Sequence, residues 1–352
     1  MTALADILSQ RIAATGPMTL ADYMAECLLH PTLGYYTTRD PFGRAGDFIT
    51  APEISQMFGE LIGLCLAQVW LDQGQPPTFV LAELGPGRGT LMADALRATS
   101  MVPGFHAAAE ICLVEASPVL RARQAKSLSG HRVTWCDGVQ DLPKGPLYLI
   151  ANEFFDALPI RQFQRAGRGW RERMVGPGLD RAFGPGLGPE VRVGALDARL
   201  DDVTTGEIVE LCPLGPLIIA EMSSRVAASG GVVLIVDYGG WGSLGDTFQA
   251  VKSNGTTDPF AEPGQADLTA HVDFRALADA SGLAHLYRTQ GGFLRALGIA
   301  ARSARLTRGL QGAALQSHLA ATQRLTDDGA MGILFKALVL YPADAPQPPG
   351  FA

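Results

Sequence analysis

Acidic residues stand at or just after successive apolar, strand-like runs of this sequence, where each could bind a cation or a hydroxyl group. They are Glu83, Glu115, Asp137 and Glu153. In open parallel α/β sheets, ligands bind beyond the carboxyl ends of the strands. Four acids at four such ends therefore predict one shared binding site, although any single acid could simply be a solvated helix cap.

The element that must position the first acid is the segment 79–90, which has the pattern of a strand, a glycine turn and the start of a helix. The turn has glycines at alternating positions, namely Gly85, Gly87 and Gly89. Glycine carries no Cβ, so the backbone can approach a ligand closely, and the N–H groups at the start of the helix point at that ligand. A turn that binds nothing is the simpler alternative, and the acid and the helix in register argue against it.

The nature of the ligand depends on Glu83 and Thr90. Glu83 lies two residues before the first glycine, where a fixed carboxylate would repel a pyrophosphate and attract a cation. Thr90 occupies the place of the third glycine in the G-x-G-x-x-G fingerprint of dinucleotide-binding proteins. Both features favour S-adenosylmethionine, which carries a sulfonium and an ammonium group, over a nicotinamide dinucleotide. The pattern E-x-G-x-G-x-G is typical of Rossmann-like methyltransferases.

The remaining strand ends suit the other parts of this cofactor. Glu115 can accept hydrogen bonds from both ribose hydroxyls, and Asp137 can accept one from the adenine amino group. Glu83 faces the amino-acid end. The predicted cofactor-binding set consists of these acids, the glycine turn with Thr90, and Asn152 after the fourth strand.

The fourth strand end predicts the position of the methyl acceptor. Asn152, Glu153 and Asp156 provide one amide and two carboxylates within five residues. Two carboxylates can hold a guanidinium through charge-assisted hydrogen bonds and orient one nitrogen toward the methyl group. We therefore predict that Glu153 and Asp156 are catalytic. The alternative is that Asn152 and Asp156 only cap a following helix.

Strand and helix patterns alternate along the chain, which predicts an α/β fold of the Rossmann-like class I methyltransferase type, with a mostly parallel sheet covered on both faces. Three stretches are expected to be irregular: an exposed loop over 176–189, a long functional loop over 240–270 and a disordered tail. The predicted divisions are an N-terminal helical region over 1–75, the first part of the core over 76–159, an insertion with short strands over 160–212, the second part of the core over 213–342 and the tail over 343–352.

The composition argues against several classes of function. The 352 residues carry a net charge of −7 and no long basic run, so no nucleic-acid partner is predicted. The five cysteines are scattered without a C-x-x-C pair, so no zinc site, and no other metal, and no disulfide framework are predicted. No apolar run is long enough to span a membrane and no signal peptide is evident, which predicts a cytoplasmic protein.

With these motifs the chain resembles the MidA-type S-adenosylmethionine-dependent methyltransferases, a family that includes the mitochondrial arginine methyltransferase needed for assembly of respiratory complex I. Besides the glycine turn, the resemblance rests on His30–Tyr36, Gly46–Ser55, Asn152–Pro159, Asp267–Phe274 and Met331–Lys336. It implies that Asp47 and Phe48 lie near the cofactor. It also implies that the partner is a protein substrate, an arginine-bearing subunit of respiratory complex I.

The chain departs from the family in the loop after Ala250, where Lys252-Ser-Asn254 replace a frequent histidine, so no catalytic role is assigned to that loop. The absence of a recognisable mitochondrial targeting segment fits a bacterial, cytoplasmic member, whose substrate need not be the mitochondrial one. We expect in-line transfer of the sulfonium methyl group to a protein nitrogen. A non-catalytic assembly factor that only binds the cofactor is an alternative, and a nicotinamide-dependent oxidoreductase is a third reading that Glu83 argues against. The oligomeric state stays open.

Overall fold

The computed structural model describes residues 2–38, 50–179, 182–253 and 255–351. The chain divides into two compact units, each assembled from three separated stretches. The core unit consists of Ile49–Phe155, Leu217–Gly239 and Ala276–Ala352, and the accessory unit of Met1–Phe48, Asp156–Pro216 and Gly240–Arg275. The N-terminal helical stretch is thus shared between the two units, with its boundary after Phe48.

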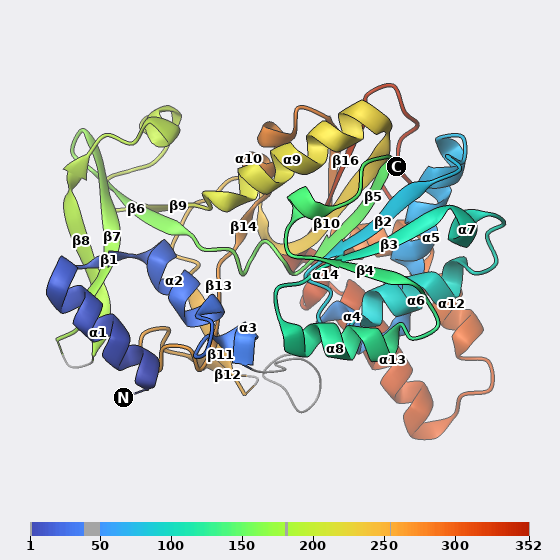
Figure 1. Ribbon diagram of the computed structural model, residues 1–352, viewed down its shortest axis with the longest axis horizontal. Helices are drawn as coiled ribbons and strands as arrows, with labels where there is room; N and C mark the ends of the chain where they lie inside the picture. The colour runs from blue at the N-terminus through green and yellow to red at the C-terminus, as the bar shows by residue number, and fades with distance from the viewer. Residues whose placement is uncertain (1, 39–49, 180–181, 254, 352) are drawn as a thin grey trace. The chain divides into compact units, whose positions relative to one another are not determined.

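The core unit contains a sheet with the strand order β15-β16-β10-β5-β2-β3-β4. Its strands are β2 (Phe79–Leu84), β3 (Ala109–Val114), β4 (Val133–Cys136), β5 (Leu147–Asn152), β10 (Gly231–Gly240), β15 (Ala284–Thr289) and β16 (Phe335–Tyr341). The strands β4, β3, β2, β5 and β10 run parallel (Figure 1), whereas β16 is antiparallel to both of its neighbours. Every residue of β2 and β5 is buried, as expected for parallel strands covered on both faces. The predicted mostly parallel α/β sheet is confirmed.

The chain reverses its direction across the sheet between β2 and β5. From β2 it moves outward through β3 to β4, then returns to β5 on the other side of β2 and continues to β10. Because crossovers between parallel strands are right-handed, the helices after β2 and β3 cover one face and the helix between β5 and β10 covers the other. These helices are α6 (Thr90–Thr99), α8 (Pro118–Ser127) and α9 (Leu214–Ser229). Open sheets bind ligands at such a switch point, beyond the carboxyl ends of the strands.

The face of the sheet that α6 covers is also covered by α5 (Gln56–Asp72), whose apolar residues belong to the same buried cluster as those of β2, β5 and β10. A Cβ added at Gly63 would lie 2.6 Å from the Cα of Ala95, so only glycine allows α5 and α6 to pack this closely. The sequence pattern predicts one helix from Pro52 onward. Instead, the extended backbone of Ser55 (φ −156°, ψ 132°) separates α4 (Ala51–Ile54) from α5, and the Ser55 side chain caps α5.

The remaining helices of the core unit follow β10 in the sequence, except α7, which precedes β3. They are α7 (Phe105–Ala108), α10 (Phe274–Ser281), α11 (Gln290–Ala296), α12 (Ile299–Leu306), α13 (Gly312–Thr326) and α14 (Met331–Leu334). The tail that follows β16 is ordered, contrary to the prediction. The Gly350 carbonyl accepts a hydrogen bond from Arg288 Nη1 at 3.0 Å, and the Phe351 ring lies 5.0 Å from that of Phe293.

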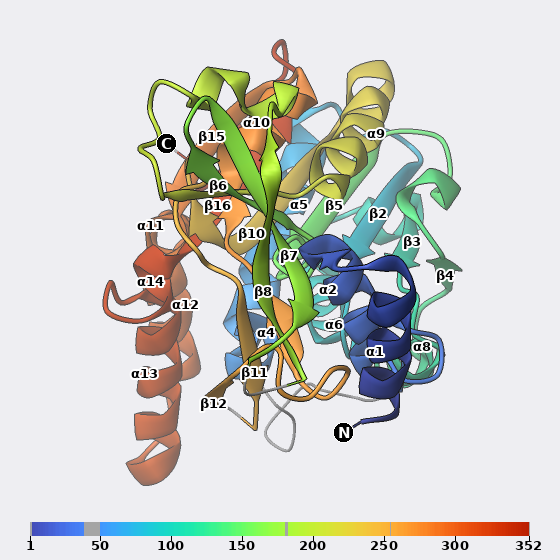
Figure 2. The ribbon, with the colours of Figure 1, turned by 90° about the vertical axis from the view of Figure 1, so that its left-hand side faces the viewer.

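The accessory unit combines three helices with two antiparallel sheets (Figure 2). The helices are α1 (Ala3–Thr15), α2 (Leu20–Leu29) and α3 (Tyr35–Thr38). One sheet has the order β1-β7-β6-β9 with β8 on β7, and the other has the order β12-β11-β13. The strands of these two sheets are β1 (Met18–Thr19), β6 (Arg161–Ala166), β7 (Gly169–Pro177), β8 (Phe183–Val191), β9 (Ile208–Leu211), β11 (Gln249–Lys252), β12 (Gly255–Thr257) and β13 (Asp267–Thr269). The short strand β14 (Val272–Asp273) belongs to neither of these two sheets.

Two expected loops prove to contain strands. The Gly/Pro-rich stretch 176–189 includes most of β8, which pairs antiparallel with β7, and the stretch 240–270 includes β11, β12 and β13. In both cases pairing with a neighbouring strand overrides a composition that is unfavourable for strands. Among the described residues, no helix combines the length and the apolar character needed to cross a membrane.

Candidate active site

The glycine turn connects the carboxyl end of β2 to α6. Gly85, Gly87 and Gly89 have left-handed backbone, with φ of 59°, 52° and 79°, which residues with a Cβ rarely adopt. A Cβ at Gly85 would lie 3.0 Å from Phe154 Cδ2. Gln124 Nε2 donates to the Gly87 carbonyl at 2.8 Å and ties the turn to α8. The residue before α6 is Gly89, which has no side chain to cap the helix.

Glu83 is only 3 % exposed near the carboxyl end of β2. Its Oε2 atom has no hydrogen-bond partner in the described part of the chain. The pKa of Glu83 is raised to about 8, mainly because the carboxyl group is buried. A hydrogen bond from the Met92 backbone N–H lowers the pKa, and the charge of Glu115 raises it further. The protein therefore holds this carboxyl group protonated at neutral pH, and a cation bound beside it would favour the carboxylate.

Glu115 directly follows β3 and is 9 % exposed. Its Oε1 accepts from the Ser117 N–H at 2.8 Å, and its Oε2 accepts from Gln124 Nε2 at 3.1 Å. Burial raises its pKa, and these hydrogen bonds oppose the rise. Each carboxylate oxygen can accept more than one hydrogen bond, so capacity is left for hydroxyl donors. The ribose contact of Glu115 stays a prediction.

Asp137 directly follows β4, and its side chain is 87 % exposed. Arg121 of α8 forms an ion pair with it and also donates to the carbonyl groups of Glu115 and Cys136. Arg121 therefore fixes the ends of β3 and β4 relative to each other. The adenine contact of Asp137 stays a prediction.

The end of β5 and the turn after it hold two polar residues that the sequence predicts beside the ligands, Asn152 as the last residue of the strand and Glu153 as the first of the turn. Glu153 has φ of 51°, which is unusual for a residue with a Cβ. Its Oε1 accepts from the Ala51 N–H and from Asn152 Nδ2, both at 3.2 Å. Asn152 is 7 % exposed, and its Oδ1 has no hydrogen-bond partner among the residues described. The structure thus brings Asn152, Glu153 and the start of α4 together.

Asp237, at the end of β10, holds this turn in place. It is fully buried, and its Oδ2 accepts from the backbone N–H groups of Phe154 at 3.2 Å and of Phe155 at 3.0 Å. Its Oδ1 accepts from the N–H of Tyr238 at 2.9 Å. Its place at the fifth strand end is recognisable from the sequence, but its function as the anchor of the neighbouring turn is not. No helix follows the turn, so the alternative of a helix cap at Asn152 and Asp156 is wrong.

Asp156 belongs to the accessory unit, whereas Glu153 belongs to the core unit. It is 6 % exposed, and its carbonyl accepts from the Ala270 N–H at 3.0 Å. Within the same unit, Tyr36 donates to Asp267 Oδ1 at 2.7 Å. Burial, followed by the charges of Asp267 and Asp156, raises the pKa of Tyr36 well above its ordinary value. Three motifs of the family resemblance therefore converge in the accessory unit.

The segment Gly46–Ser55 contributes to the glycine turn through a residue that the sequence analysis did not select. Glu53 Oε1 accepts from Thr90 Oγ1 at 2.5 Å, which links α4 to the first residue of α6. The glycines after β2 drew attention to Thr90, but nothing in the sequence indicated its partner. Asp47 and Phe48 lie outside the described residues, so their expected place near the cofactor stays a prediction.

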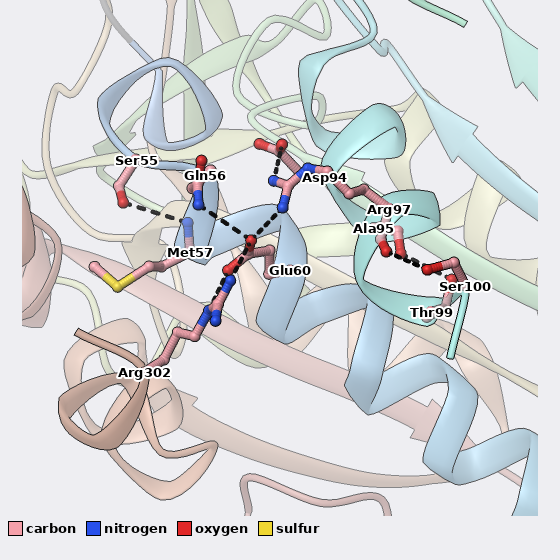
Figure 3. Close-up of polar contacts among 10 residues, drawn as sticks. All are labelled: Ser55, Gln56, Met57, Glu60, Asp94, Ala95, Arg97, Thr99, Ser100 and Arg302. Atoms are coloured by element: carbon pink, nitrogen blue, oxygen red, sulfur yellow. Dashed lines mark hydrogen bonds and ion pairs between the residues drawn. The ribbon is translucent and has the colours of Figure 1, made fainter. Parts of the chain in front are cut away.

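A buried carboxylate connects the helices α5, α6 and α12 (Figure 3). Glu60 of α5 is 2 % exposed and binds Arg302 of α12 in a bidentate manner, at 2.7 and 2.9 Å. Arg97 of α6 donates to the same carboxylate at 2.6 Å, and Arg97 also binds Asp94. Burial raises the pKa of Glu60, but the hydrogen bonds and charges of the two arginines outweigh it, and the net shift is downward.

We expect Glu60→Gln to lower the free energy of unfolding by about 2 kcal/mol at pH 7, because charge-assisted hydrogen bonds contribute about 1.5–3 kcal/mol. The folded pKa lies below that of the unfolded chain, so this contribution exists above the unfolded pKa and disappears as the pH falls through the folded pKa. Urea unfolding at pH 7 and at acidic pH tests both points. Glu221→Gln, which removes the ion pair between an exposed carboxylate and Arg225, should change stability far less. Equal losses for the two variants would contradict the prediction.

Comparison with known proteins assigns the chain to a family. Residues 61–291 match the family model described as "Putative S-adenosyl-L-methionine-dependent methyltransferase". The chain belongs to this family of S-adenosylmethionine-dependent methyltransferases.

Relatives with known names and structures resemble this methyltransferase over most of its length. It is 39 % identical over 329 residues to "Protein arginine methyltransferase NDUFAF7, mitochondrial" of Danio rerio, covering 84 % of this chain and 76 % of the relative. It is 36 % identical over 378 residues to the homolog of Drosophila melanogaster, covering 96 % and 85 %. A crystal structure of a Burkholderia thailandensis protein bound to S-adenosyl-homocysteine matches with a TM-score of 0.84 and 29 % identity, covering 99 % of this chain and 94 % of that protein. The predicted family, fold class and cofactor are confirmed.

The residues at the switch point fit the cofactor of the methyltransferase. Two buried oxygens, Glu83 Oε2 and Asn152 Oδ1, have no partner among the described residues and can accept hydrogen bonds from a bound ligand. The glycine turn leaves the backbone of Gly85–Gly89 open to close approach. S-adenosylmethionine supplies an electrophilic methyl group on a sulfonium.

We expect the affinity for S-adenosylmethionine to rise with pH up to about 8, because the cation favours the ionised form of Glu83, whose pKa is about 8 in the unliganded protein. Binding at pH 7 should therefore release a proton. Calorimetry in two buffers of different ionisation enthalpy measures this proton, and Glu83→Gln should abolish its release. The raised pKa also means that the unliganded protein loses stability as the pH rises from about 4.5 to about 8, a loss that the Gln variant should lack. Unchanged proton release in the variant would assign the proton to another group.

Glu115→Ala should weaken the binding of S-adenosylmethionine by about 1.5–3 kcal/mol, which is the range for hydrogen bonds to a charged group. The binding of S-adenosylhomocysteine should weaken by the same amount, because both ligands contain the ribose. Calorimetry with both ligands tests this expectation, and Glu110→Ala, an exposed acid on the same strand, serves as the control. Weaker binding of only one of the two ligands would show that Glu115 does not contact the ribose.

Proposed function

We propose that this methyltransferase methylates a protein nitrogen, namely an arginine in a subunit of respiratory complex I. The names of two relatives support the arginine. The relatives from Danio rerio and Drosophila melanogaster carry the name protein arginine methyltransferase, and their similarity covers 84 % and 96 % of this chain. The complex I acceptor rests on the family resemblance of the motifs.

The single observation that carries this proposal is the carboxylate of Glu153 at the switch point. It stands on a left-handed turn, and two hydrogen bonds from the backbone N–H groups of Phe154 and Phe155 to Asp237 hold that turn in place. Its Oε1 is fixed by the Ala51 N–H and by Asn152 Nδ2. A carboxylate has about four acceptor sites, so this arrangement can receive N–H groups of a guanidinium in addition. A carboxylate fixed in this way orients the acceptor without reorganisation during the reaction.

The proposed reaction is an in-line displacement. The lone pair of one guanidinium nitrogen forms a bond to the methyl carbon while the bond from that carbon to sulfur breaks. The sulfur keeps the electron pair, and the nitrogen gives up one proton to solvent. The chain contributes mainly by positioning, since Glu153 lowers the freedom of the guanidinium and concentrates negative charge beside it.

The test is incubation of the purified protein with labelled S-adenosylmethionine and a lysate from a strain that lacks the protein. We expect label in one or a few proteins, recovered as methylarginine after hydrolysis. Recovery as another methylated residue would overturn the arginine assignment. Tight cofactor binding without transfer to any lysate protein would instead favour a non-catalytic assembly factor.

A further inference from the structure

The accessory unit contains a cavity of about 280 Å³ to which the proposed transfer reaction assigns no function. Five of its eleven lining residues come from the stretch 240–270, and the others come from α2, β6, β7 and β8. Seven of the eleven are apolar, among them Leu20, Val175, Phe248 and Phe260. The volume lies just below the roughly 300–1,000 Å³ of small-molecule sites, so it suits a single side chain with its adjoining backbone.

The polar end of the cavity is a fixed network around Arg173. Arg173 Nη1 donates to Gln162 Oε1 at 2.8 Å and to Asp246 Oδ2 at 2.5 Å. Gln162, which is 2 % exposed, uses its amide group to bind Asp246 at 2.7 Å and the buried Glu210 at 2.6 Å. The Arg173 guanidinium is thereby held rigidly. Its Nε and Nη2 atoms have no acceptor in the part of the chain that the structure describes.

The charges around Arg173 decide which ligand group it can bind. Asp246 pairs with Arg173, Asp258 also lines the cavity, and Gln162 binds the carboxyl group of Glu210, whose pKa is raised by burial. A free anion therefore gains little here, and the apolar walls disfavour a bare cation. A neutral carbonyl oxygen is not repelled by these carboxyl groups and carries no charge that the apolar walls would disfavour. It can therefore accept hydrogen bonds from the remaining N–H groups of the guanidinium. The rings of Phe248 and Phe260 lie 5.8 Å apart at 54° to each other and form part of the apolar wall.

We propose that this cavity binds an apolar side chain of the methyl-acceptor protein, of the size of leucine, while Arg173 donates to a neighbouring backbone carbonyl of that protein. The identity of the occupant rests on the proposed function, because it presupposes a protein acceptor. The stretch 240–270 thereby obtains a function, since it supplies one wall and the partner of Arg173. None of the residues that line the cavity belongs to the predicted cofactor-binding set.

Methyl NMR spectroscopy of the full-length protein, without cofactor, tests this site directly. The methyl groups of Leu20, Met174 and Val175 line the cavity and report on its occupation. The probes are three peptides, acetyl-Gly-X-Gly-amide, in which X is leucine, lysine or glutamate. We expect the leucine peptide to shift these resonances and to bind about tenfold more tightly than the other two, because only its side chain can be buried without a charge against the apolar walls. A preference for the lysine or the glutamate peptide, or no shift with any peptide, would overturn the proposal.

Two variants separate the polar and apolar contributions. Arg173→Lys keeps the charge beside Asp246 but removes the extra N–H groups, and we expect about fivefold weaker binding. Phe248→Ala should weaken binding about tenfold. Arg168→Lys, at an exposed turn of the same unit, is the matched control and should bind like the wild type. Because Phe248→Ala could also destabilise the unit, its unfolding midpoint is measured, and Arg173→Lys decides the outcome if that variant does not fold.

The outcomes for the cavity and for the transfer reaction are distinguishable. If the leucine peptide binds as expected but no lysate protein is methylated, the result supports the binding of an apolar side chain in the cavity and contradicts the proposed methyl transfer. If lysate proteins are methylated and Arg173→Lys leaves the KM for them unchanged, the cavity has no part in acceptor binding. A rise in KM with unchanged kcat supports the proposal.

Discussion

Glu153→Gln is expected to lower the rate of methyl transfer by about 10²-fold or more, since a lost charge-assisted interaction of ~3 kcal/mol corresponds to two decades at 1.36 kcal/mol per decade. The substitution keeps an oxygen that can accept from the Ala51 N–H, so the turn after β5 should keep its shape. Affinity for the cofactor should hardly change. Single-turnover transfer and calorimetry on the same preparation measure both quantities.

Two further variants make this result specific. Glu110→Gln removes an exposed acid of the core unit and should transfer at the wild-type rate. Asp156→Asn should lower transfer less than Glu153→Gln, because Asp156 belongs to the other unit and its amide replacement keeps similar hydrogen-bonding capacity. A wild-type rate for Glu153→Gln would show that Glu153 is structural and that the acceptor binds elsewhere.

Gly87→Val is expected to abolish measurable binding of S-adenosylmethionine. A valine side chain would project from the turn at the switch point, where the backbone has to approach the ligand. The φ of 52° at this position also strains a β-branched residue, at a cost of about 1–3 kcal/mol. Calorimetry measures the affinity, and thermal unfolding measures the strain.

Gly74→Val separates strain from obstruction. Gly74 lies in the core unit with φ of 84°, and a Cβ added there meets nothing within 4 Å. Both variants should therefore be destabilised to a similar extent, but only Gly87→Val should no longer bind S-adenosylmethionine. If Gly87→Val binds the cofactor with wild-type affinity, the cofactor site is not at this turn.

The sequence was sufficient to predict the parallel sheet and the glycine turn because both depend on local signals. Continuous apolar runs predict strands buried on both faces, and glycines between a strand and a helix predict a ligand turn. The acids at the strand ends were found for the same reason, since their position is tied to the run that precedes them. The structure adds the partners of these residues, such as Gln124 on the turn and Asp237 under Glu153.

The unsuccessful predictions concern segments whose structure depends on distant partners. The strand β8 forms in a stretch rich in glycine and proline because β7 supplies its hydrogen bonds, and the tail is ordered because Arg288 and Phe293 bind it. A local pattern contains no information about such partners. The division of Glu153 and Asp156 between two units was hidden for the same reason, because three residues of separation suggest one site.

The composition of the accessory unit from three stretches has a consequence for protein synthesis. Thr2 Oγ1 donates to the Pro263 carbonyl at 3.1 Å, and Tyr23 donates to the Pro259 carbonyl at 2.8 Å, so the first helices find their partners more than 230 residues later. At roughly 5–20 residues per second, the ribosome needs roughly 10–50 s to produce them. During this interval the apolar faces of α1 and α2 lack their native cover. The nascent chain should therefore depend on chaperones that bind its N-terminal segment, and translation rate should affect the yield of folded protein.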